Sequence, residues 1–97
     1  MPLKVYMTNI ASNQLTTGNQ RKLKHILDTN KIPYTEIDIS DSKNSNEKEF
    51  LQRTLASLNQ KMSLPQVFNN EQYCCDFEGI LSAVECDSLK ETLKLID

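Results

Sequence analysis

The three cysteines are the residues of this sequence with the most distinctive chemistry. Cys74 and Cys75 are adjacent, and Cys86 follows further along the chain. This spacing contains no C-x-x-C, the pattern of a thioredoxin-type redox centre, and it is no zinc-knuckle pattern either. An odd number of thiols with two adjacent is also not a disulfide framework, so we expect all three to be reduced in a reducing compartment.

The three thiols are expected to differ in their surroundings. Free cysteines are often buried, so we expect Cys74 and Cys86 to be small core residues. Cys75 directly precedes Asp76, which we predict to begin a helix. The dipole and free donors of a helix N-terminus lower a thiol pKa, whereas the carboxylates of Asp76 and Glu78 oppose a thiolate. Cys75 is therefore either an inert thiol or, with Cys74, the candidate redox-sensitive thiol.

Other nucleophiles lack the partners that catalysis needs. The polar segment 9–17 holds Ser12 and two threonines but no cysteine. A hydroxyl is a weak nucleophile unless a general base lies beside it. His25, the only histidine, falls well inside a predicted helix, so we expect neither a catalytic residue nor a metal site.

The elements that position these groups include four strands, which the alternation of apolar residues predicts. The second strand places Thr35, Ile37 and Ile39 on one face, and the third is entered directly from Pro65. The last two strands flank a turn at 69–71, as a hairpin would. The predicted strands cover residues 3–8, 34–39, 66–68 and 72–74.

Apolar residues at helical spacing predict four helices. The first covers residues 20–30, with Leu23, Ile26 and Leu27 on its buried side. The others begin at capping residues, namely Asn44 with Glu47, Asp76, and Ser88 with Glu91. Their expected buried residues are Phe50, Leu51, Leu55 and Leu58 in the second helix, Phe77, Ile80, Leu81 and Val84 in the third, and Leu89, Leu93 and Ile96 in the fourth.

This order predicts an α/β fold. The first half is a βαβ unit, which requires a parallel strand pair with a right-handed crossover. The second half is a β-hairpin followed by helices. We therefore expect a four-stranded mixed sheet flanked by four helices, in a single domain over residues 1–97.

Composition excludes several classes of partner. A net charge of -2 gives no field that would attract a polyanion, so we expect neither nucleic acid nor a membrane surface as a partner. The sequence shows no secretory signal at its start and no apolar run long enough to span a membrane. We expect a soluble intracellular protein.

The element order, with a proline opening the third strand, is the plan of the thioredoxin fold. The segment from Pro65 to Asp76 is the most specific stretch, and it resembles the SH3-domain-binding glutamic-acid-rich-protein-like family, especially its short member. Supporting stretches along nearly the whole chain are Lys4-Val5-Tyr6, Ile26-Leu27-Asp28, Asp38-Ile39-Ser40 and Leu93-Lys94-Leu95.

This resemblance implies a glutaredoxin-like domain without the redox motif, in cytoplasm and sometimes nucleus, that binds proteins. We expect a monomer. Longer members carry a proline-rich stretch before the third strand, but here Met62-Ser63-Leu64-Pro65 holds one proline and no PxxP. SH3 domains are therefore not expected to bind by that route. The glutamate-rich tail of the family is also absent from this sequence.

The resemblance also implies a ligand groove. Glutaredoxins hold glutathione with a Gly-Gly pair and an acidic residue before the third helix, where this sequence has Cys75, Asp76 and Glu78. Pro65 falls at the fold's cis-proline, so Leu64 and Pro65 are expected to line the groove opposite Ser12. Side chains in place of glycines obstruct close backbone approach, and glutathione binding stays an open alternative.

The sequence thus favours a non-enzymatic interaction module with no metal or cofactor. The alternative is a glutathione-binding or thiol-based redox-sensing protein that uses Cys75 or Cys74. A third possibility keeps the fold as a scaffold, with the partner surface elsewhere, for example on the first helix.

Overall fold

The fold is built on one mixed sheet of four strands. The structure, a computed structural model, describes residues 3–10 and 14–95. The strands are β1 (Leu3–Met7), β2 (Tyr34–Asp38), β3 (Gln66–Asn69) and β4 (Gln72–Asp76), arranged in the order β2-β1-β3-β4. β1 and β2 are parallel, and the other two pairs are antiparallel. The predicted βαβ unit followed by a hairpin is therefore confirmed.

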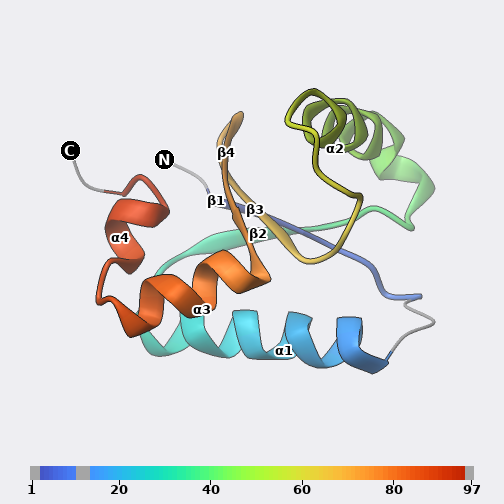
Figure 1. The fold of residues 1–97 in the computed structure, drawn as a ribbon. Helices are drawn as coiled ribbons and strands as arrows, with labels where there is room; N and C mark the ends of the chain where they lie inside the picture. The colour runs from blue at the N-terminus through green and yellow to red at the C-terminus, as the bar shows by residue number, and fades with distance from the viewer. Residues whose placement is uncertain (1–2, 11–13, 96–97) are drawn as a thin grey trace.

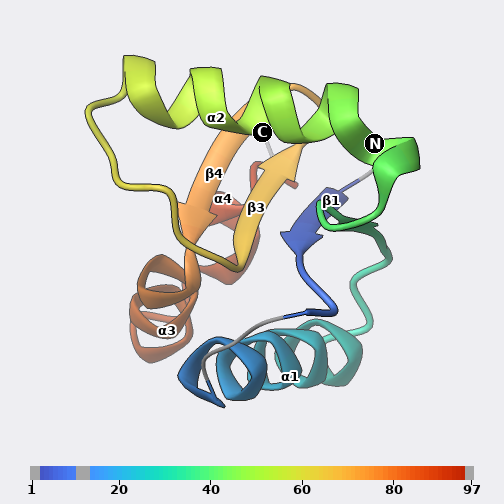
Figure 2. The same ribbon diagram turned by 90° about the vertical axis from the view of Figure 1, so that its right-hand side faces the viewer.

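Helices cover both faces of this sheet (Figures 1 and 2). α2 lies across one face, whereas α1 and α3 lie together on the other, and α4 follows α3 at the end of the fold. A short 3-10 helix, η1, leads into α2. The helices are α1 (Gln14–Thr29), η1 (Ser42–Asn44), α2 (Ser45–Ser57), α3 (Phe77–Glu85) and α4 (Leu89–Thr92).

The two faces of the sheet contribute to two apolar clusters because side chains alternate along a strand. On β1, Leu3 and Val5 belong to the larger cluster, which includes residues of α1, α3 and the C-terminal segment. Tyr6 belongs to a second cluster that includes Leu51 and Leu55 of α2. On β3, Val67 and Phe68 divide in the same way.

Polar contacts in two places fix peripheral elements to the sheet. Tyr6 donates a hydrogen bond of 2.7 Å to Glu47 in the first turn of α2, and Lys4 lies 3.6 Å from the same carboxylate. The pKa of the Tyr6 hydroxyl is raised, first by burial and then by Glu47. On β3, the buried Asn69 donates to the carbonyls of Leu93 and Lys94, at the C-terminal end of α4.

α1 is longer than its apolar spacing predicted. It begins at Gln14, six residues before the predicted start at Gln20. Threonines and a glycine weaken helix propensity over residues 16–18, but tertiary contacts outweigh them. Gln20 is buried and forms two hydrogen bonds of 3.0 Å with the backbone of Thr8, one as donor and one as acceptor.

Three residues expected in the core are exposed. The relative accessibilities are 45% for Leu58, 42% for Leu81 and 47% for Val84. α3 has nine residues and buries only a narrow stripe, in which Ala83 takes the inward position that we expected for Val84. Leu58 lies just beyond the last turn of α2, at its C-cap.

The capping predictions had different outcomes. Asp76 caps α3 as expected, because its carboxylate accepts a 2.9 Å hydrogen bond from the Gly79 amide. Asn44 and Ser88 form no side-chain cap. Asn44 instead donates to the Asp38 carbonyl, which ties the start of α2 to the end of β2.

The two glycines provide a matched test of how closely α3 approaches the sheet. A Cβ atom on Gly79 would lie 2.6 Å from the Cβ of Cys75, whereas a Cβ on Gly18 in α1 would meet nothing within 4 Å. Gly79→Ala should lower the free energy of unfolding by about 1–3 kcal/mol. Gly18→Ala should raise it by roughly 0.5–1 kcal/mol through helix propensity. Urea denaturation measures both, and equal changes in the two variants would contradict this close approach.

Candidate functional site

The predicted groove residues meet where β3 begins and β4 ends. The antiparallel register pairs Gln66 with Asp76, so Pro65 and the first turn of α3 flank the same edge of the sheet. The Leu64–Pro65 peptide bond is cis, as the resemblance implied. Ser12, which we expected on the opposite wall, lies outside the described residues.

The two acidic residues at this edge have different roles. The Asp76 carboxylate is half-buried and caps α3 through the Gly79 amide. Glu78 is exposed in the first turn of α3, where a carboxylate also complements the helix dipole. The acidic residues therefore stabilise the start of α3, and Glu78 remains accessible to a partner.

Cys75 faces the core and not the groove. It is 7% exposed and belongs to the same apolar cluster as Phe77 and Ile80. Burial raises its pKa to about 12, and the neighbouring Cys74 and Asp76 add to the increase. Of the two alternatives for Cys75, the inert thiol agrees with the structure and the thiol of lowered pKa does not, because Cys75 is a residue of β4 whose side chain is buried.

The other two thiols differ from each other. Cys74 is half-buried against the same cluster as Cys75, next to a register irregularity in the β3–β4 pairing. Burial also raises the pKa of Cys74. Cys86 is exposed at the C-cap of α3, so the expectation that it is a core residue is wrong. α3 ends there, and the residues that the structure describes leave this position exposed.

The residues around Pro65 are more buried than a groove lining would be. Leu64 is half-buried and packs against the cluster beneath α2, and Pro65 is buried. Gln66 is fully buried, and its Nε2 donates to the Ser63 hydroxyl at 3.0 Å. Its Oε1 has no partner among the described residues. The sequence analysis did not predict that Gln66 is buried and bonded to Ser63. The signal for it was a polar residue in a strand directly after Pro65.

The end of β1 forms a second polar region that sequence reasoning missed. Asp38 accepts hydrogen bonds from the backbone and side chain of Asn9 and from Ser40. The bond from the Ser40 side chain is the main reason that the pKa of Asp38 is lowered. A cleft of about 170 Å³ lies nearby, lined by Asn9, Arg21 and other residues of β1 and α1. The Gln20 amide there bonds to the Thr8 backbone, and the Asn9 Nδ2 donates to Asp38.

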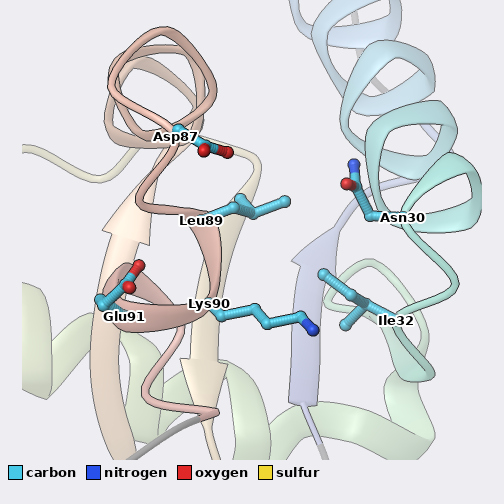
Figure 3. Close-up of a pocket in the computed structure, with 6 residues that line it drawn as sticks. All are labelled: Asn30, Ile32, Asp87, Leu89, Lys90 and Glu91. Carbon is cyan, nitrogen blue, oxygen red and sulfur yellow. The ribbon is translucent and has the colours of Figure 1, made fainter.

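A larger cleft of about 280 Å³ lies where α1 ends, beside the α3–α4 connection (Figure 3). Since α1 has 16 residues, this cleft lies roughly 24 Å from the start of α1, where the predicted groove was placed. No periodicity or motif predicts this cleft, because its walls come from two segments, residues 30–32 and 87–91, that lie far apart in the chain. Its lining residues are Asn30, Ile32, Asp87, Leu89, Lys90 and Glu91.

A match to a known protein family extends along almost the whole chain. Residues 1–96 match the family described as "SH3-binding, glutamic acid-rich protein". The chain belongs to this family. A Drosophila melanogaster relative named "SH3 domain-binding glutamic acid-rich protein homolog" is 33% identical over 98% of the chain. The chain spans 65% of that relative's length.

Solved structures give the same fold for this member of the SH3-binding glutamic acid-rich family. The C. albicans actin interacting protein Aip5 superposes with a TM-score of 0.77 at 23% identity, covering 98% of this chain and 90% of that one. A buckwheat glutaredoxin–glutathione complex gives 0.70 at 17% identity, covering 97% and 77%. These likenesses confirm the glutaredoxin-like fold.

The part of the chain that the structure describes offers no metal site. Within residues 3–10 and 14–95, no three His, Cys, Asp or Glu residues group as ligands would. His25 is exposed on α1. Among the same residues, no helix is both long enough and apolar enough to cross a membrane.

The exposure and pKa differences predict an order of thiol reactivity. In a brief treatment with N-ethylmaleimide at pH 7.5, which is roughly one unit below an ordinary thiol pKa, Cys86 should be modified first. Cys75 should be modified at least about tenfold more slowly, because it is buried and protonated. Mass spectrometry of peptides measures each site, and protein unfolded in urea serves as the control in which the rates converge. If Cys75 reacted as fast as Cys86 in folded protein, the described burial would be wrong.

Proposed function

We propose that this protein is a non-catalytic, glutaredoxin-like module that binds other proteins. The observation that carries this proposal is the state of Cys75, the thiol nearest the predicted groove. It is buried, protonated at neutral pH and packed against Gly79. A disulfide reductase needs an accessible thiolate, and Cys75 does not supply one.

The sequence supports the same conclusion at the other wall of the groove. The segment that leads into α1 contains no cysteine between residues 9 and 17. The dipole and donors of the α1 N-terminus therefore have no thiol to activate. A hydroxyl could replace it only with a neighbouring base, and His25 lies in the fourth turn of α1.

The relatives' names support protein binding. The family and its Drosophila relative are named for SH3 binding, and one structural neighbour is named for interaction with actin. We propose protein partners without a PxxP-mediated SH3 contact, because residues 62–65 hold a single proline. Actin is a reasonable first partner to test, although the likeness to that neighbour concerns the fold alone.

A coupled reductase assay tests the non-catalytic proposal. The protein is incubated with a small disulfide, glutathione, glutathione reductase and NADPH, and NADPH loss is followed by absorbance. The rate should equal the rate without protein, and an active glutaredoxin is the positive control. A rate above background that disappears in Cys75→Ser, and persists in Cys86→Ser, would instead support the thiol-based alternative.

A further inference from the structure

The cleft at the C-terminal end of α1 combines an apolar floor with polar walls. Ile32 and Leu89 form its apolar part and pack on the larger core cluster. In Figure 3 the side chains of Asp87, Leu89 and Lys90 extend from the α3–α4 segment toward α1. Asn30 extends from the opposite wall toward Asp87. The cleft holds about 280 Å³, enough for one long side chain.

Two hydrogen-bond acceptors converge on this cleft. The Asn30 Nδ2 donates to the Ile26 carbonyl at 2.8 Å, which fixes the amide and leaves Oδ1 as an acceptor. Asp87 supplies a carboxylate and forms no ion pair with any residue that the structure describes. A planar donor group could therefore bond to both walls at once.

The charge of the cleft favours a cation. Its lining carries two carboxylates, Asp87 and Glu91, and the single ammonium of Lys90. In Figure 3 the Glu91 side chain points away from Asn30 and Ile32, so Asp87 is the acid that faces the opposite wall. α1 and α3 both end here, at Thr29 and Glu85, and a helix C-terminus carries partial negative charge. A metal ion is disfavoured by the apolar floor and by the lack of three grouped ligands in residues 3–10 and 14–95.

We propose that this cleft binds an arginine side chain presented by a protein partner, an inference that rests on the proposed protein-binding function. The guanidinium would donate to Asp87 and to Asn30 Oδ1, because its donors form a rigid fork. The aliphatic stem would pack on Ile32 and Leu89, as long charged side chains do on apolar surface. Lys90 weakens this binding by repulsion.

NMR titration of the labelled protein with N-acetyl-arginine amide tests the site without a known partner. Shifts should centre on Asn30, Asp87 and Leu89 and saturate in the millimolar range. N-acetyl-citrulline amide, of the same shape without charge, should bind more weakly. Stronger binding of N-acetyl-glutamate amide at these residues, or no localised shift with arginine, would overturn the proposal.

Variants distinguish arginine binding in the cleft from a general effect of the protein's charge. Asp87→Asn should weaken arginine binding by roughly two- to fivefold, the range for a partly exposed ion pair, and asparagine tolerates the positive φ of 53° at this position. Lys90→Gln should strengthen binding. Glu85→Gln, an exposed acid outside the lining, is the control and should change little. Equal effects of Asp87→Asn and Glu85→Gln would refute the site, while leaving the reductase test of the proposed function unaffected.

Discussion

Burial of the two central strands on both faces is the constraint on which the rest of the structure depends. β1 and β3 send alternate side chains into two clusters, so both faces of the sheet must be covered. α1 and α3 cover one face and α2 covers the other (Figure 2). Chemistry is then confined to the ends of strands and helices, and this is where the cis-proline edge and the cleft beside α4 are found.

The same packing explains why the thiol nearest the groove does not act as a nucleophile in our account. α3 approaches β4 so closely that only glycine is accommodated at position 79, opposite Cys75. Where glutaredoxins use small residues to admit a ligand's backbone, this chain uses the close approach to seat a helix on its own sheet. Asp76 is likewise used to begin α3. The same fold can therefore be kept while groups at the position of the predicted site serve stability.

Sequence patterns predicted the elements whose signals are local. Residues close together in the sequence determine the alternation of the strands, the Asp76 cap and the proline before β3. The predicted topology was derived from these local signals. The exposure of Leu58, Leu81 and Val84 could not be predicted, because it depends on which elements cover each helix face. The early start of α1 was missed for a similar reason, since Gln20 contacts Thr8 across the fold.

The candidate site was predictable only in part. The resemblance brought Pro65 and Asp76 to one edge, and the strand register agrees. The inward direction of Cys75 depends on the pleat and on the register irregularity in the β3–β4 pair, neither of which a sequence motif encodes. The cleft of Figure 3 joins Asn30 with Asp87 and could be found only once α1 and α4 were placed in space.

We propose that the ligand groove implied by the resemblance is closed and that binding by this protein involves neither glutathione nor a thiol. The most direct test of this proposal is a two-dimensional NMR titration of the labelled, reduced protein with reduced glutathione. If the groove is closed, the amide signals of residues 64, 66 and 75–79 should keep their positions at millimolar glutathione. Saturable shifts confined to those residues would show an intact groove and contradict the account.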